Sequence, residues 1–359
     1  MHIDFSSSQR TSLGVEWELE LVDLDTRQLT AGADEILIAI SPNGDGVHPK
    51  AKHELLQSCV EVITGICQTV AEARADLAET VAQVAKAAEP RNLGVMCSGT
   101  HPMTDWATQR ITADERYATL VERNQWMARQ LQIFGIHVHC GIRSPDKAIP
   151  ILNGLLAYVP HFWPFPPPAR IGSARIPGWR LIAARYSRRC PPPACPFQLS
   201  GWDAFEKYMD ALISSQAIQS IREVWWDIRP HPGFGTVELR ICDGLPTLDE
   251  IACVAALSQC LVERFDRQLD YGYTCPSRDR GWSERTSGEP PDTGWTREIV
   301  VDNTGRVQPL TTAITDLVED LLPIARRLDC SEELEAIPRL MDRGCELPPA
   351  ARRCGGEQR

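Results

Sequence analysis

The fold of this chain is decided by the stretch Leu13-Gly14-Val15-Glu16-Trp17-Glu18-Leu19-Glu20-Leu21-Val22. Apolar and acidic side chains alternate along it, which is the two-residue period of a β-strand. Glu16, Glu18 and Glu20 should therefore point to one face of the predicted strand. An isolated acidic row is most often a solvated edge strand, so this stretch alone favours that interpretation, and a functional one needs support from other motifs.

The acidic row is nevertheless well suited to a divalent cation. Carboxylates that share a strand face repel one another and lose hydration on folding, so they are stable mainly beside cations. Mg²⁺ prefers oxygen ligands and commonly joins carboxylates to substrate phosphates. The sequence contains no G-x-x-x-x-G-K-[ST] loop, so a nucleotide has to be held in some other way. We therefore consider a Mg²⁺ site that holds ATP.

The composition is that of a globular protein with a small soluble substrate. The 359 residues are 43% hydrophobic, which is enough for a sizeable core, and the net charge of -11 argues against a nucleic-acid or anionic-membrane surface. No apolar stretch approaches the roughly 18 residues of a membrane span, and residues 1–5 lack the order of a signal peptide. We expect a cytoplasmic protein. The thirteen cysteines include no C-x-x-C pair, which indicates buried reduced thiols.

Strands and helices are mixed without a regular βαβ repeat, which favours an α+β fold over a doubly wound parallel sheet. The capping boxes Thr112-Ala113-Asp114-Glu115 and Thr247-Leu248-Asp249-Glu250 each predict the start of a helix. Alternation or 3.6-residue spacing predicts strands over residues 13–22, 59–64, 136–139 and 235–241, and helices over residues 69–88, 112–132, 202–222 and from 248 onwards.

A second motif, Gly135-Ile136-His137-Val138-His139, places two imidazoles on one side of a short strand. Such a pair suits a metal ion or a phosphate oxygen, but histidines buried in the core fit the pattern equally well. A zinc amidohydrolase is the distant alternative. It requires a (β/α)₈ barrel with further histidine ligands, and only His161 and His231 follow in the sequence.

A third motif is the strand Gly235-Thr236-Val237-Glu238-Leu239-Arg240, which follows the charged turn Trp226-Asp227-Ile228-Arg229-Pro230. Glu238 can hold a metal ion while the guanidinium of Arg240 grips a phosphoryl group or a carboxylate. The alternative is a structural ion pair of Glu238 or Asp227 with an arginine.

Together these motifs resemble the bacterial carboxylate-amine ligases of glutamate–cysteine ligase type 2, the YbdK-like branch. The resemblance covers about residues 3–162, 197–274 and 297–340. It rests on the order and spacing of five motifs, which are residues 14–18, 53–65, 99–102 and 135–139, and residues 226–230 taken with 235–240.

The resemblance implies a glutamine-synthetase-like fold, a curved, mainly antiparallel sheet with helices packed behind it. ATP, Mg²⁺ and the amino acid would lie on its concave face, and Arg240 would stabilise the transferred phosphoryl group. Arg229 and Thr100 are expected to contact substrate, whereas Glu20 lies beyond the matching motif. The implied metal shell is Glu16, Glu18, Glu54, Glu61, His137 and Glu238, of which Glu16, Glu18, His137 and Glu238 would also contact ATP.

The reaction implied by the resemblance joins glutamate to cysteine or another amine through an acyl phosphate, with weak glutamate–cysteine ligase activity. A homo-oligomer is compatible with it, and neither a nucleic-acid nor a membrane partner is implied. We expect one catalytic domain over residues 1–340, followed by an irregular tail over 341–359.

Two segments depart from the family pattern, at about residues 163–196 and 275–296. The first has nine prolines and six arginines but no Asp or Glu. We interpret both segments as products of compensated reading-frame shifts. We interpret the tail as the product of a frame shift that is not compensated. An intact reading frame on resequencing the DNA would contradict this interpretation. The alternative function is therefore a catalytically impaired relative that binds ATP or an amino acid without turnover.

Overall fold

The structure is a computed structural model that describes residues 1–162, 198–275, 298–302 and 304–343. Both segments that depart from the family pattern lie almost wholly outside these residues. The strands are β1 (Leu13–Asp23), β2 (Ala51–His53), β3 (Cys59–Ile63), β4 (Leu93–Met96), β5 (Gly135–Gly141), β6 (Ile228–His231), β7 (Thr236–Asp243), β8 (Glu298–Val300) and β9 (Val307–Pro309). The helices are α1 (Ala33–Ile40), α2 (Val70–Ala88), α3 (Glu115–Asn124), α4 (Trp126–Arg129), α5 (Pro145–Leu156), α7 (Trp202–Ser214), α8 (Leu248–Asp270), α10 (Leu310–Leu328) and α11 (Ser331–Arg343).

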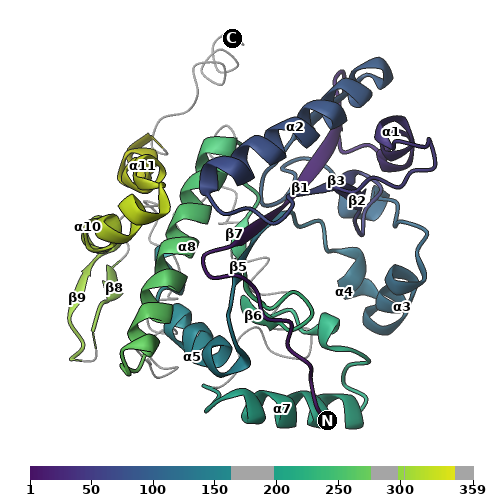
Figure 1. Cartoon of the computed structure of the whole chain (residues 1–359). Helices are drawn as coiled ribbons and strands as arrows, with labels where there is room; N and C mark the ends of the chain where they lie inside the picture. The colour runs from purple at the N-terminus through teal and green to yellow at the C-terminus, as the bar shows by residue number, and fades with distance from the viewer. Residues whose placement is uncertain (163–197, 276–297, 303, 344–359) are drawn as a thin grey trace.

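The main sheet places the acidic strand in its interior. Its strand order is β2-β3-β1-β5-β7-β6, with β4 paired to β1, and the pairings are antiparallel (Figure 1). Strand β1 pairs with β3 and β5 on its two sides. The interpretation of residues 13–22 as a solvated edge strand is therefore wrong. The alternation inside the strand could not reveal this, because edge and interior strands share the same period.

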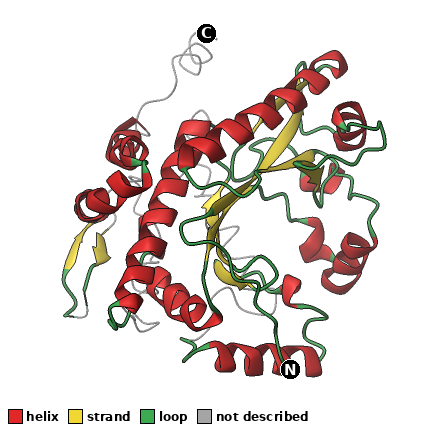
Figure 2. Ribbon diagram, in the orientation of Figure 1, coloured by secondary structure: helices red, strands yellow, loops and turns green. Residues whose placement is uncertain are grey.

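Helices cover one face of the sheet and leave the acidic face to the site. Val15, Trp17 and Leu19 alternate with the glutamates and belong to the hydrophobic core. Helices α2, α5 and α8 pack against the sheet on this apolar side, and α10 and α11 pack on α8 as an outer layer (Figure 2). Each large apolar side chain buried in this way contributes about 1.5 to 3 kcal/mol.

The helix expected over residues 112–132 is shorter and broken. Its N-cap is Asp114, whose carboxylate accepts from the Arg116 amide, and the capping box at Thr112 is wrong. The Thr112 hydroxyl instead donates to the Glu54 carbonyl at 2.6 Å. At Gln125 the backbone has a φ of 49°, which ends α3 before α4 begins. A tertiary hydrogen bond thus replaced the local cap.

The other predicted helices differ mainly in their ends. Helix α7 stops at Ser214 and not near residue 222, because Gln216 adopts a left-handed φ of 59°. The capping box at Thr247 is confirmed, with Glu250 as its partner. Helix α11 continues to Arg343, and the remainder of the predicted tail lies outside the described residues. The described cysteines form no disulfide and, apart from Cys275, are buried.

The N-terminal segment fixes the turn between β6 and β7. The Ser6 amide donates to the Pro232 carbonyl at 2.9 Å, and the Ser8 hydroxyl donates to the Phe234 carbonyl at 2.6 Å. Gly235 has a φ of +63°, and a Cβ atom there would lie only 1.4 Å from the Ser6 carbonyl oxygen. Glycine is therefore required at this close approach of two chain segments.

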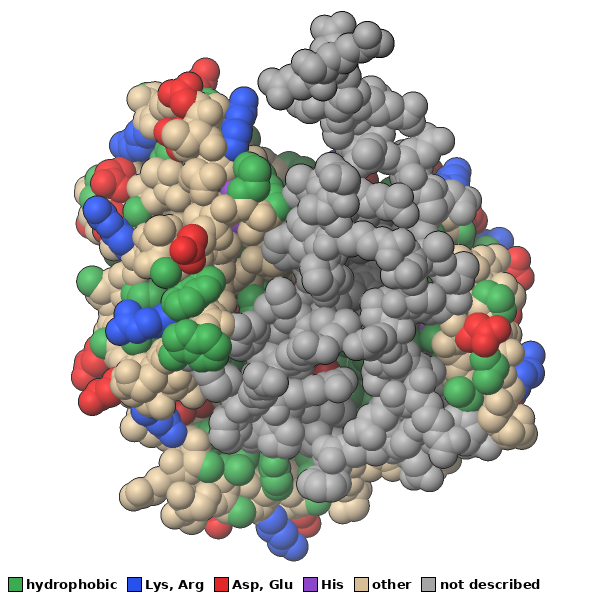
Figure 3. Space-filling model, turned by 180° about the vertical axis from the view of Figure 1, so that it is seen from behind, with side chains coloured by type: hydrophobic (Ala, Val, Ile, Leu, Met, Phe, Trp, Pro, Cys, Tyr) green, Lys and Arg blue, Asp and Glu red, His purple; other side chains and the backbone are tan. Residues whose placement is uncertain are grey.

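The described surface shows mixed charge. On the face seen in Figure 3, acidic and basic side chains are interspersed among the described residues and do not gather into a basic patch. Within the described ranges, no helix has both the length and the apolar character needed to cross a membrane.

An ion-pair network ties α8 to the segments before β1 and after β5. Arg143 Nη2 lies 2.7 Å from Asp266 and 2.6 Å from Asp270, and Lys147 Nζ lies 2.5 Å from Asp270. Arg10 joins the same helix through Glu263 at 2.8 Å. Hydrogen bonds from Lys147 and Arg143 lower the pKa of Asp270 to about 2.

This network should make stability depend on acid pH. Because the folded-state pKa of Asp270 lies below its unfolded value of about 3.9, its ion pairs stabilise the protein above that value and are lost as the pH falls towards 2. We expect Asp270→Asn to lower the free energy of unfolding at pH 6, with a difference from the wild type that shrinks between pH 5 and pH 2. Urea titrations across this range measure it. A difference that stays constant with pH would contradict the assignment.

Candidate active site

Strand periodicity brings the ionisable side chains of six strands, β1, β2, β3, β5, β6 and β7, onto one face. On β1, β3, β5 and β7 the apolar residues face the helices, and the residues between them face the opposite side. In register, Glu16 lies opposite His137, Glu18 opposite Glu61, and Glu238 opposite both His139 and Arg229. The alternation predicted from the sequence for Glu16, Glu18, His137 and Glu238 is confirmed.

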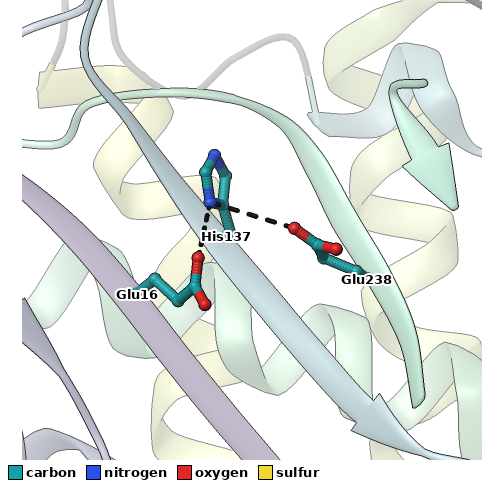
Figure 4. Close-up of side chains that lie close together, drawn as sticks. All are labelled: Glu16, His137 and Glu238. Carbon is teal, nitrogen blue, oxygen red and sulfur yellow. Dashed lines mark hydrogen bonds and ion pairs between the residues drawn. The ribbon is translucent and has the colours of Figure 1, made fainter. Parts of the chain in front are cut away.

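The first group of candidate ligands consists of Glu16, His137 and Glu238 (Figure 4). His137 Nδ1 lies 2.9 Å from Glu16 Oε2 and 4.0 Å from Glu238 Oε1. Because a carboxylate can only accept, Nδ1 donates to Glu16. Burial alone would raise the pKa of Glu16, but the interactions with His137 and His139 outweigh it and lower the pKa. Glu16 is therefore ionised.

The second group consists of Glu18, Glu61 and His137, whose ligand atoms lie within 4.8 Å of one another. The Gly135 amide donates to Glu18 Oε2 at 2.7 Å. Loss of hydration and the neighbouring Glu54 carboxylate nonetheless raise the pKa of Glu18 to about 8. Burial and the nearby Glu16 raise the pKa of Glu61 in the same way. These two acids thus have too little positive charge beside them.

Glu238 is compensated by two arginines. Arg229 Nε donates to Glu238 Oε2 at 2.6 Å and Arg229 Nη2 donates to Oε1 at 3.3 Å, while Arg240 Nη1 donates to the same Oε1. The ion pair considered as the structural alternative is therefore present. These guanidinium groups outweigh burial and hold the pKa of Glu238 well below its usual range. The pair also belongs to the site, because Arg240 Nη1 lies 3.2 Å from His137 Nδ1.

Two expected site residues lie apart from these groups. Glu54 belongs to neither, because it follows β2 and its Oε2 accepts from the Leu55 amide at 2.9 Å. Its charge still acts on Glu18. Thr100 is held in the loop after β4, where its carbonyl accepts from the Ser98 hydroxyl, and its substrate contact stays a prediction. Glu20 accepts two hydrogen bonds from Ser98, which accords with leaving it out of the site.

Three features of the site were missed at the sequence level. His139 Nε2 lies 3.4 Å from Glu16 Oε1, whereas the sequence placed His139 on the same side as His137 but did not assign it to the site. Lys52 Nζ lies 2.9 Å from Glu61 Oε2. Phe234 stacks on His231 with ring centroids 4.1 Å apart and an interplanar angle of 11°. Neither the Lys52–Glu61 pair nor the Phe234–His231 stack could have been predicted, because a single lysine and an isolated turn form no recognisable sequence pattern.

The donor set fits a divalent cation with a preference for oxygen. Four carboxyl groups on this face (Glu16, Glu18, Glu61 and Glu238) and the nearby Glu54 make five acids, against three cationic side chains (Lys52, Arg229 and Arg240). With neutral histidines, two negative charges stay uncompensated when all the acids are ionised. Carboxylate oxygens are the ligands that Mg²⁺ prefers, so residues and charge both suit that ion. The zinc-barrel alternative is wrong for the described chain, because its main sheet is antiparallel.

The excess of acid predicts that neutralising one carboxylate stabilises the metal-free protein. We expect Glu18→Gln to raise the free energy of unfolding in EDTA at pH 7.5 by on the order of 1 to 2 kcal/mol. Folding shifts the pKa of Glu18 up to about 8, so the wild type has to take up a proton on folding at this pH, whereas glutamine is neutral in both states and keeps the acceptor for Gly135. Urea denaturation measures the change, and Mn²⁺ binding should weaken in the same variant. A variant less stable than the wild type would show that Glu18 serves a structural purpose.

Comparison with solved structures identifies the fold. A glutamate–cysteine ligase of Francisella tularensis, solved in complex with AMP, matches with a TM-score of 0.65 over 97% of this chain and 85% of that chain, at 11% identity. A bifunctional glutathione synthetase of Pasteurella multocida matches with a TM-score of 0.62 over 93% of this chain and 48% of that chain, at 14% identity. The expected glutamine-synthetase-like α+β fold is confirmed.

Comparison of sequences identifies the family. A protein of Frankia casuarinae, provisionally named glutamate–cysteine ligase 2-1, is 49% identical over 368 residues, which cover 99% of this chain and 94% of the relative. A Thermobifida fusca protein, provisionally named glutamate–cysteine ligase 2, is 42% identical over 96% of this chain and 86% of its own length. The model of glutamate–cysteine ligase family 2 matches residues 12–354. The chain therefore belongs to glutamate–cysteine ligase family 2.

Proposed function

We propose that this protein is an ATP-dependent carboxylate-amine ligase with weak glutamate–cysteine ligase activity. The observation that carries the proposal is the pair of ligand groups that share His137 on the acidic face of the sheet, with Arg240 beside them. Mg²⁺ bound there would neutralise the phosphate oxygens of ATP. The residues of the chain would position the two reactants and balance charge, which is the main task of an enzyme in phosphoryl transfer.

The reaction has two steps. A side-chain carboxylate oxygen of glutamate attacks the γ-phosphorus of ATP, the bond to the β–γ bridging oxygen breaks, and ADP leaves with that electron pair. The amine of cysteine then attacks the acyl phosphate, phosphate leaves, and the amine releases a proton to form γ-glutamylcysteine. Arg240 contributes positive charge next to the transferred phosphoryl group, and Arg229 keeps Glu238 in place while it lies close to the substrate.

An aromatic stack beside the metal groups is suited to the base of ATP. Phe234 is 59% exposed and stacks on His231. Both rings meet His139 edge-on at centroid distances of 5.6 and 5.7 Å, and His139 itself approaches Glu16. A base can stack on an exposed aromatic ring while its phosphates reach the acidic groups. The AMP complex of the Francisella tularensis ligase supports a nucleotide in this fold.

The first test is amino-acid-dependent release of ADP. With Mg²⁺, ATP, glutamate and cysteine, we expect turnover in the wild type and loss of at least about a hundredfold in Glu16→Gln, because that carboxylate both binds metal and holds His137. Thermal unfolding of the variant controls for its fold. Unchanged activity would remove Glu16 from the site. If ATP binds but no amino acid stimulates its cleavage, the protein is the catalytically impaired relative. A panel of amines in the same assay identifies the acceptor.

The second test concerns the aromatic stack. Phe234→Ala should raise the KM for ATP by about tenfold, because one base–aromatic contact is lost, and should leave inhibition by inorganic tripolyphosphate unchanged. Tyr271→Ala is the matched control, since this exposed aromatic residue lies at the C-terminal end of α8. Equal losses for ATP and tripolyphosphate would show that the substitution disturbs the phosphate site and not a base contact.

A further inference from the structure

Lys52 lies where the acidic cluster meets solvent. It is on β2, directly opposite Glu61 of β3, and its Nζ lies 2.9 Å from Glu61 Oε2. The carboxylate is only 2% exposed, whereas the lysine side chain is 50% exposed. The flexible side chain of Lys52 is therefore partly in solvent, while its ammonium group contacts the buried carboxylate of Glu61.

This ammonium group is the main compensation for Glu61. Burial and the carboxylates of Glu16, Glu54 and Glu18 all raise the pKa of Glu61, and the charge of Lys52 acts in the opposite direction. Burial would lower the pKa of Lys52, but Glu61 and Glu16 outweigh it and raise the pKa, which keeps the lysine charged.

The same carboxylate is also a candidate ligand. Glu61 forms a tight group with Glu18 and His137 that suits a divalent cation. A metal ion bound to this group and the ammonium of Lys52 would be two cations competing for one carboxylate. At the other end of the site, the guanidinium of Arg240 is 22% exposed and Glu238 is 1% exposed, so that pair is less free to separate.

We propose that Lys52 is a tethered counter-ion that neutralises Glu61 while the site is free of metal and is released when a divalent cation binds. The inference rests on the proposed metal site. Its consequence is that Lys52 weakens the binding of bare metal ions, because each binding event has to break the ion pair. The released ammonium then lies at the mouth of the site, where an anionic oxygen of the incoming nucleotide can replace Glu61 as its partner. Lys52 thereby favours a metal ion that arrives with phosphate over one that arrives alone.

The experiment measures Mn²⁺ binding to the full chain by electron paramagnetic resonance, without nucleotide. Lys52→Met should bind Mn²⁺ about threefold to tenfold more tightly than the wild type, because a competing cation is gone. Lys52→Arg should bind like the wild type. Lys50→Met is the matched control, because Lys50 lies two residues away and pairs with Asp76 of α2 outside the site.

A second readout is the thermal unfolding temperature. Lys52→Met should unfold at a lower temperature than the wild type in EDTA, and saturating Mn²⁺ should abolish the difference. If the methionine variant fails to fold without metal, Lys52→Gln provides the same comparison with a polar side chain. Mn²⁺ affinity that is unchanged or weaker in both neutral variants would overturn the role of Lys52. A wild type that binds no Mn²⁺ would instead overturn the metal site of the proposed function.

Discussion

The structure depends on a sheet that holds more negative than positive charge on one face. Glu18 and Glu61 lie directly opposite each other on neighbouring strands, and like charges in that position destabilise a sheet. The opposite face supplies the compensation, because Trp17 and Val62 of the same strands pack into a core beneath α2 and α8. Apolar burial on one side of β1 and β3 thus maintains a crowding of acids on the other side, and protonation of Glu18 and Glu61 or a nearby cation relieves it.

The charges divide the site into two halves with different properties. Around Glu238, two guanidinium groups hold a carboxylate that is almost fully buried, so this half is compensated before any ligand binds. Around Glu61, compensation comes from one half-exposed lysine, so this half can exchange its cation. The two halves meet at His137, which belongs to both ligand groups. The donors around Glu238 are therefore already held by ion pairs when a cation arrives. The donors around Glu61 can instead exchange Lys52 for the incoming cation.

The sequence predicts the faces of the strands better than their neighbours. Alternation placed Glu16, Glu18, His137 and Glu238 on one side correctly, because the side-chain direction in a strand is a local property. It could not show that β1 is an interior strand, since pairing is set by residues far away in the chain. The same limit explains Lys52, whose role depends on a cross-strand register with Glu61. It also explains the helix at residue 112, where a hydrogen bond to Glu54 replaced the local cap.

The geometry of the site and the stability of the fold depend on the same strand register. Because side chains alternate, a slip of one residue in β5 would turn His137 into the core and Val138 towards the acids. The core contacts of Val138 and its neighbours oppose that slip, so they set where the imidazole lies relative to Glu16. Apolar residues on the helix-covered face thus help to set the distances between the candidate metal ligands on the other face. The arrangement of the acidic face therefore depends on a well-packed opposite face as much as on the glutamates themselves.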